Sequence, residues 1–268
     1  MQQSIGPIVR QWLTVVAVLM AIALNGLSNI YPPAGKNTGE VANTVLGGVL
    51  ITPEGYAFAI WGLIYVGLIA YSIYQALPGQ RHIPAFKKVS WAVIGACLLQ
   101  IIWLYVFLTY QFWLSVAFML GILGCLIVAY IETRSVRATR AVRWLLQAPI
   151  SVYFGWITVA AVVNVAGALY TMSIPVDPIS EFSGAVDAST SGLVATVVMI
   201  CVSAGIAAIV ALQYKDATYP AVAVWALVAI AIRNAALTPI AFISIAMAVG
   251  LCLIIARIKF TRRPLPSP

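Results

Sequence analysis

Long apolar runs alternate along this chain with short polar or glycine- and proline-rich segments. Each of eight runs approaches or exceeds the roughly 20 apolar residues that an α-helix needs to cross a bilayer. The predicted spans cover residues 11–30, 56–77, 89–110, 112–131, 144–170, 191–213, 218–236 and 239–258. These runs are too long and too continuous for the strands of a membrane β-barrel. The pattern predicts an all-α integral membrane protein with about eight transmembrane helices.

Composition supports this prediction. Of the 268 residues, 63% are hydrophobic and only 8% are charged, and soluble proteins do not have such a composition. The net charge of +8 comes from short basic clusters between the apolar runs, so we expect the lipid bilayer, and not nucleic acid, as the partner of these clusters. The four cysteines lie in four different predicted spans without a CxxC pair, so we expect free apolar side chains and no disulfide or metal site.

The basic residues predict the orientation, because Lys and Arg near helix ends resist translocation. With the N-terminus in the cytoplasm, all of the 15 Lys and Arg residues except Lys36 and Arg233 fall on the cytoplasmic side. All of the seven acidic residues except Glu132 and Asp216 fall on the other side. We therefore expect both termini in the cytoplasm, in a bacterial inner membrane or a thylakoid membrane.

Two long connections organise the chain. Residues 28–55 are rich in Gly, Pro and Asn and form either a plain connector or a cover over a binding site, as loops of this length in compact bundles often do. An acidic, proline-containing connection at 173–190 divides a five-helix bundle, residues 1–172, from a three-helix extension, residues 191–268. The third and fourth spans are joined only around "TYQFW", which predicts a tight antiparallel hairpin.

Three of the spans carry stripes of aromatic and polar residues at helical spacing. Steps of three, four or seven place the members of each stripe on one face of its helix. The stripes comprise Phe58, Trp61, Tyr65 and Ser72 in the second span, Gln100, Trp103 and Phe107 in the third, and Tyr153, Trp156, Ala160 and Asn164 in the fifth. Such rings either pack one helix against another, or belong to the interfacial aromatic belt, or line a ligand site.

The two amides within these stripes narrow the alternatives. Gln100 and Asn164 lie well inside their helices, where an amide facing lipid without a hydrogen-bond partner is costly, so both should point into the bundle. There each amide bonds either another helix, for about 1 kcal/mol or less, or a ligand. A cavity lined by rings with a few amides and phenols suits a flat apolar molecule with polar edges.

Other residues bear on catalysis and transport. The one histidine, His82, lies in a basic connection, and no acidic residue lies at the centre of a span, so we expect neither an enzyme nor an ion-coupled pump. The chain also lacks the internal repeat that many secondary transporters show. We expect Arg233, near the end of the seventh span, to extend to the headgroups, with a clamp for a ligand carboxylate or phosphate as the alternative.

Short motifs in three spans resemble one family. Trp156, Ala160 and Asn164 form a W-x-x-x-A-x-x-x-N motif, and Tyr153 precedes it by three. "QIIWLYVF" is similar to N-x-x-W-x-x-x-F with Gln100 in place of the asparagine, and "WGLIY" matches W-x-x-x-Y. In this order they resemble the TspO/MBR tryptophan-rich sensory proteins, which include the mitochondrial translocator protein. The resemblance covers the first five spans.

The resemblance implies a five-helix bundle whose cavity, bounded by the loop after the first helix, binds tetrapyrroles such as porphyrin or haem, sterols or similar lipophiles. The family's W-x-F-x-x-x-W becomes "YAFAIW", with Tyr56 for the first tryptophan and one residue fewer before Trp61. Loss of one helical residue rotates the preceding residues by about 100°, which changes where Tyr56 and Phe58 point. The family's proline in the fifth span is displaced to Pro149.

Our leading hypothesis is a non-enzymatic membrane receptor or carrier that binds such a ligand among the first, second, third and fifth spans. It requires no cofactor, although porphyrin, haem or lipid would be the bound molecule. The predicted ligand-binding residues are Phe58, Trp61, Tyr65, Gln100, Trp103, Phe107, Tyr153, Trp156, Ala160 and Asn164. The alternatives are a structural or pigment-holding subunit of a larger membrane complex and a facilitator for a small solute. A homodimer or a membrane-complex partner is compatible with each.

Overall fold

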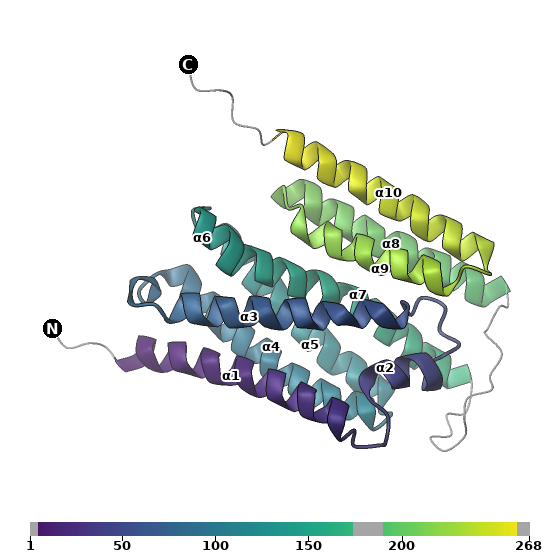
Figure 1. Ribbon diagram of the computed structural model, residues 1–268, viewed down its shortest axis with the longest axis horizontal. Helices are drawn as coiled ribbons and strands as arrows, with labels where there is room; N and C mark the ends of the chain where they lie inside the picture. Colours follow the sequence, from purple (N-terminus) through teal and green to yellow (C-terminus); the bar gives the residue numbers. More distant parts are fainter. Residues whose placement is uncertain (1–4, 174–189, 262–268) are drawn as a thin grey trace.

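The computed structural model describes residues 5–173 and 190–261, and these residues form a helical protein (Figure 1). Its elements are α1 (Ile5–Ile30), α2 (Thr38–Glu40), the π-helix η1 (Val41–Val45), the 3-10 helix η2 (Gly55–Ala59), α3 (Ile60–Ala76), the 3-10 helix η3 (Pro78–Gln80), α4 (Pro84–Leu108), α5 (Phe112–Arg134), α6 (Arg140–Val142), the π-helix η4 (Arg143–Gln147), α7 (Ala148–Ser173), α8 (Thr190–Tyr214), α9 (Thr218–Arg233) and α10 (Thr238–Thr261). Within the described ranges, seven helices are long and apolar enough to cross a membrane, and α9 is a shorter apolar helix. The expected all-α membrane protein is confirmed.

Two of the predicted spans differ locally from regular α-helices. The second span begins with the 3-10 helix η2, which is wound more tightly than an α-helix. The fifth begins earlier than expected, at Arg140, and passes through the π-helix η4 just before Pro149. Proline has no N–H, and its ring clashes with the carbonyl four residues earlier, so a wider turn at this point lets the helix continue.

The connection between α4 and α5 is the predicted tight hairpin. Tyr110 has a φ of 61°, in the left-handed region that side chains other than glycine seldom adopt. Its N–H bonds the carbonyl of Phe107 (3.1 Å), and the N–H of Gln111 bonds that of Val106 (3.1 Å). These bonds satisfy carbonyls at the end of α4 and reverse the chain within three residues.

The helices lie roughly antiparallel in two groups (Figure 1). α1, α3, α4, α5 and α7 pack together, and α8, α9 and α10 pack against one another and contact the first group mainly through α9 and α7. The first and last helices have their outer ends on the same side of the molecule, which we call the termini end. The opposite side, the loop end, carries residues 31–54 between α1 and η2, which we call the cover loop.

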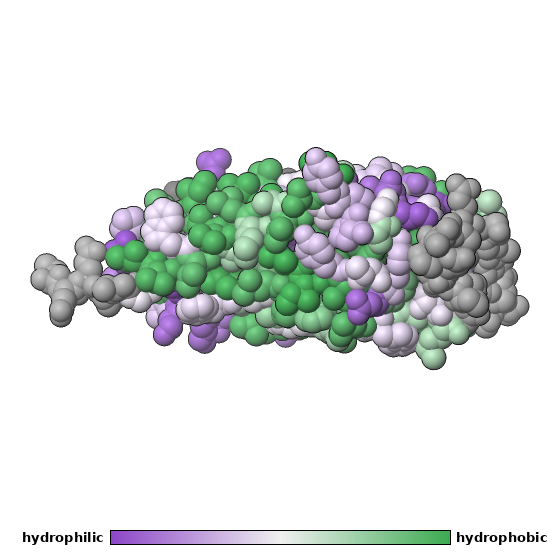
Figure 2. All heavy atoms as spheres, turned by 90° about the horizontal axis from the view of Figure 1, so that it is seen from below, coloured by the Kyte–Doolittle hydropathy of each residue, from purple (hydrophilic) through white to green (hydrophobic). Residues whose placement is uncertain are grey.

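The outer surface suits a bilayer. Figure 2 shows hydrophobic residues over the middle of one face, with most hydrophilic residues toward the two ends. On α3, for example, Leu63, Val66 and Ile73 are each about 60% exposed or more, and lipid would cover them. These exposed apolar side chains belong to a membrane-facing surface.

Buried polar groups near the termini end tie α1 to α3 and α4. Arg10 is only 4% exposed and donates to the carbonyl of Phe86 (2.8 Å) and the hydroxyl of Ser90 (2.9 Å). The amide of Gln11 donates to the carbonyl of Gln75 (2.6 Å), and the amide of Gln75 donates to the carbonyl of Gln11 (2.9 Å). Because such groups are costly in an apolar interior without partners, these bonds specify how α1 packs.

Candidate functional site

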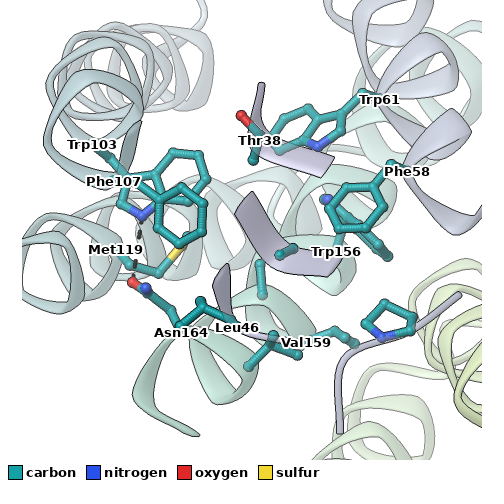
Figure 3. Close-up of a pocket in the computed structure, with 14 residues that line it drawn as sticks. Thr38, Leu46, Phe58, Trp61, Trp103, Phe107, Met119, Trp156, Val159 and Asn164 are labelled. Atoms are coloured by element: carbon teal, nitrogen blue, oxygen red, sulfur yellow. Dashed lines mark hydrogen bonds between the residues drawn. The ribbon is translucent and has the colours of Figure 1, made fainter. Parts of the chain in front are cut away.

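A cavity lies at the loop end between α3, α4, α5 and α7, beneath the cover loop (Figure 3). Its free volume is about 50 Å³. The lining residues come from the cover loop, from η2 and from the four helices: Thr38, Ala42, Leu46, Pro53, Phe58, Trp61, Trp103, Phe107, Met119, Trp156, Val159, Ala160, Val163 and Asn164. We had expected α1 to contribute and α5 not to. Instead α1 packs against α3 and α4 and contributes no residue to this lining, whereas α5 supplies Met119.

The three stripes converge on this cavity. Their members that line it are Phe58 and Trp61 from the second span, Trp103 and Phe107 from the third, and Trp156, Ala160 and Asn164 from the fifth. Figure 3 shows the indoles of Trp61, Trp103 and Trp156 arranged around one space. Rings from three helices therefore face one another across a shared cavity instead of facing lipid.

The other three predicted site residues do not line it. Tyr65, Gln100 and Tyr153 each lie one turn farther from the loop end than the tryptophan of the same stripe, so they form a layer beneath the indoles. The hydroxyl of Tyr153 donates to the Gln100 amide oxygen, and the Tyr65 ring stacks on Trp61 with centroids 5.6 Å apart. These residues support the floor of the cavity.

The rings also pack against one another. Trp103 stacks on Phe107 at 5.1 Å with an interplanar angle of 22°, and Phe58 meets Trp156 edge-on at 6.0 Å and 83°. Such pairs contribute about 0.5–1.5 kcal/mol beyond the burial of their area. Helix packing and cavity lining are therefore two roles of the same side chains.

Asn164 bonds other helices while it lines the cavity. Its amide donates to the hydroxyl of Ser115 on α5 (2.9 Å), and its oxygen accepts from the indole of Trp103 on α4 (3.4 Å), as Figure 3 marks. Both intramembrane amides therefore bond neighbouring helices, which was one of the two alternatives. The bonds at Asn164 also orient the Trp103 ring.

No charged residue lines the cavity, and its polar groups are few. The hydroxyl of Thr38 is buried without a hydrogen-bond partner. The cavity thus presents apolar faces with one unpartnered hydroxyl, which suits an apolar molecule that carries a polar atom.

A comparison with protein families bears on the identity of the chain. A family model described as TSPO-like protein matches residues 11–257. The chain belongs to the TSPO-like protein family. The match covers most of α1 and most of α10, so it extends beyond the first five spans into the last three helices. No curated protein and no solved structure gives a significant match.

Membership in the family supports a membrane ligand-binding or sensing role in general terms. Its members are generally non-enzymatic. Among the described residues of this TSPO-like protein, no group of three His, Cys, Asp or Glu side chains could hold a metal ion.

Sequence reasoning missed several lining residues of the TSPO-like protein. The cover loop supplies Thr38, Ala42 and Leu46, which share one face of the short helical segment made by α2 and η1. Their spacing of four was the signal that could have found them. Met119 had no comparable signal, because it is a single methionine in an apolar helix.

The cover loop of the TSPO-like protein is a structured segment. Asn37 and Glu40 form a capping box: the Asn37 side chain accepts from the Glu40 N–H (3.0 Å), and the Glu40 carboxylate accepts from the Asn37 N–H (2.7 Å). Leu46 packs so closely on α7 that a Cβ at Gly167 would lie 2.9 Å from its Cδ1. These contacts hold the cover loop against the bundle.

In the altered motif "YAFAIW", the two aromatic residues before Trp61 point in different directions. Phe58 faces the cavity, but Tyr56 is 41% exposed and meets Trp225 of α9 edge-on at 5.2 Å. The 3-10 winding of η2, together with the missing residue, explains why Tyr56 does not line the cavity.

Arg233 of the TSPO-like protein differs from our expectation. Its guanidinium is half-buried and donates to the amide oxygen of Asn43 and to the carbonyl of Gly47 (3.4 Å), both in the cover loop. It does not extend freely toward the headgroups and does not reach the cavity lining, because the loop supplies nearer acceptors.

Proposed function

We propose that this TSPO-like protein is a non-enzymatic membrane receptor or carrier that binds a flat lipophilic molecule beneath the cover loop. Tetrapyrroles such as porphyrin or haem, and sterols, are the ligand classes we propose. The observation that carries the proposal is the convergence of Trp61, Trp103 and Trp156 from three helices on one capped cavity. Indoles offer large stacking faces, and the Thr38 hydroxyl, which has no hydrogen-bond partner, would meet an acceptor atom of the ligand.

The size of the cavity adds a requirement. Pockets that bury a drug-sized ligand usually measure about 300–1,000 Å³, whereas this one measures about 50 Å³. Entry of a tetrapyrrole or sterol therefore requires the cover loop to move outward and to carry Thr38, Ala42 and Leu46 with it. Because no charged side chain lines the cavity, we place any ligand carboxylates at the loop end, outside the apolar lining.

Ligand titration in lipid nanodiscs tests the proposal. Protoporphyrin IX, haem and cholesterol are added separately, and tryptophan fluorescence is recorded, with haem absorbance as a second signal. We expect saturable binding at micromolar concentration for at least one of them. The chain has eight tryptophans, so Trp156→Leu is compared with Trp113→Leu. The Trp113 side chain is 52% exposed and does not line the cavity.

Loss of binding in Trp156→Leu alone would support the cavity as the site. No signal change with any of the three compounds would contradict the proposal. The alternative is a structural subunit of a larger membrane complex, and native mass spectrometry of the gently extracted protein tests it. A bound protein partner in stoichiometric amount, without a retained small molecule, would favour that alternative.

A further inference from the structure

The helix α9 contacts the cover loop and η2 through several hydrogen bonds at the loop end. Arg233 donates to Asn43 and Gly47, as described above. The side-chain amide of Asn234, just after α9, donates to the carbonyl of Leu50 (2.9 Å). The Trp225 indole donates to the carbonyl of Ala57 (3.1 Å), and the N–H of Glu54 bonds the carbonyl of Ala229 (3.2 Å). We call Trp225, Arg233 and Asn234 the latch residues.

These bonds act on the neighbours of the cavity lining. Asn43 follows Ala42, Gly47 follows Leu46 and Glu54 follows Pro53 in the chain, and Ala57 precedes Phe58. In each pair one residue, namely Asn43, Gly47, Glu54 or Ala57, is hydrogen-bonded to α9, and its chain neighbour lines the cavity. The roof of the cavity is therefore positioned by residues that the latch holds, and outward movement of the roof must break their bonds to α9.

The other half of α9 is anchored to the five-helix group. The hydroxyl of Tyr219 donates to that of Thr158 on α7 (2.8 Å). A Cβ at Gly155 on α7 would lie 3.1 Å from the Cβ of Val222 and 3.2 Å from the carbonyl oxygen of Tyr219, so the two helices are in close contact. Asp216, just before α9, accepts from Arg134 on α5 (2.7 Å). α9 is thus a fixed support against which the cover loop is held.

We propose that α9 is a latch that keeps the cover loop closed, and that Arg233, Asn234 and Trp225 are positioning residues that set how fast a ligand enters and leaves. The part of this inference that concerns ligand exchange rests on the proposed function. The part that concerns the loop does not, because closure is a property of the protein without ligand. The last three helices would then control access to a cavity to which they contribute no lining residue.

Hydrogen–deuterium exchange of the full-length protein in nanodiscs tests the latch without a ligand. The double variant Arg233→Leu, Asn234→Ala should exchange the amides of residues 38–54 about tenfold faster, the effect of losing about one hydrogen bond to a charged group. Arg257→Leu, at an exposed position near the end of α10, is the matched control and should exchange them at the wild-type rate. Trp225→Phe keeps an aromatic side chain and removes the indole N–H that bonds the carbonyl of Ala57, so it tests the latch by a conservative change.

Stopped-flow tryptophan fluorescence with protoporphyrin IX tests the consequence for access. In the double variant we expect both the association and the dissociation rates to rise about tenfold, with a smaller change in Kd, because the latch opposes entry and exit alike. Wild-type exchange of residues 38–54 in both the double variant and Trp225→Phe would overturn the latch. Faster exchange with unchanged ligand rates would overturn its control of access. Absence of porphyrin binding in every form would count against the proposed function, and the exchange result would still decide whether α9 holds the loop.

Discussion

Asp216 is a buried carboxylate that joins the two groups of helices. It is 5% exposed, and one of its oxygens accepts from Arg134 on α5 (2.7 Å), Ser151 on α7 (2.8 Å) and Tyr130 on α5 (3.0 Å). Removing a carboxylate from water is costly, and only such a set of donors offsets the cost. Asp216 is one of the two acidic residues that the sequence places on the predicted cytoplasmic side, where most basic residues lie. Its hydrogen bonds to Arg134, Ser151 and Tyr130 explain why an acid occurs there.

We predict that Asp216→Asn lowers the free energy of unfolding by about 3 kcal/mol, because it leaves the partly buried Arg134 cation without its counter-charge. Equilibrium unfolding in mixed detergent measures this loss. The control is Glu132→Gln, which removes the exposed ion pair with Lys88, whose side chain is 63% exposed. Glu132→Gln should lower the free energy of unfolding by no more than about 1 kcal/mol. Equal losses in the two variants would show that the Asp216 network does not stabilise the protein.

Ala160 is the smallest residue that the fifth-span stripe contributes to the cavity. A phenylalanine at this position would fill the space between Trp156 and Asn164. We predict that Ala160→Phe weakens porphyrin binding at least about tenfold, because the ligand would have to displace a buried ring. Ala117→Phe, at an exposed position on α5, controls for a larger side chain and should bind as the wild type does. Retained affinity in Ala160→Phe would place the ligand elsewhere.

The crossing of α7 and α9 is the main contact between the two groups of helices, and it depends on a glycine. Gly155 lets the backbones approach closely at Tyr219 and Val222. Small residues commonly allow such approach in membrane helices, where van der Waals packing replaces the hydrophobic effect as the driving force.

We predict that Gly155→Ala destabilises the protein by about 1–3 kcal/mol, because the new methyl group would lie 3.2 Å from the carbonyl oxygen of Tyr219, and backbone moves less readily than a side chain. Gly205→Ala on α8 is the control, since nothing lies within 4 Å of a Cβ at that position. It should be neutral or stabilising by up to about 1 kcal/mol through higher helix propensity. Thermal unfolding followed by circular dichroism compares the two, and a stable Gly155→Ala protein would contradict the close contact.

The arrangement of the helices places both described chain ends at the termini end and the cover loop at the loop end (Figure 1). Because basic residues near helix ends favour the cytoplasm, we propose that the termini end faces the cytoplasm. In a variant without native cysteines, Lys36→Cys should then react with an impermeant maleimide from the outside of intact cells. His82→Cys should react only after lysis. The reverse pattern would invert the orientation.

Much of the fold could be predicted from the sequence, because the length and the hydropathy of a helix are properties of the segment itself. The spans, the tight hairpin near Tyr110 and the stripe positions follow from local hydropathy and from the 3.6-residue period. The site residues Trp61, Trp103 and Trp156 could be predicted from the sequence for the same reason. Two predicted segments, the acidic connection at 174–189 and the basic tail at 262–268, lie outside the described part of the chain.

The tertiary structure alone decided how deeply each residue lies and which partner it meets. Tyr65, Gln100 and Tyr153 share stripes with the indoles, yet the relative heights of α3, α4 and α7 place all three beneath the cavity. Arg233 and Asn43 are 190 residues apart, and no local pattern indicates their hydrogen bond. Periodicity specifies the face of a helix, whereas the rotation and height of one helix against another come from packing between segments that are distant in sequence.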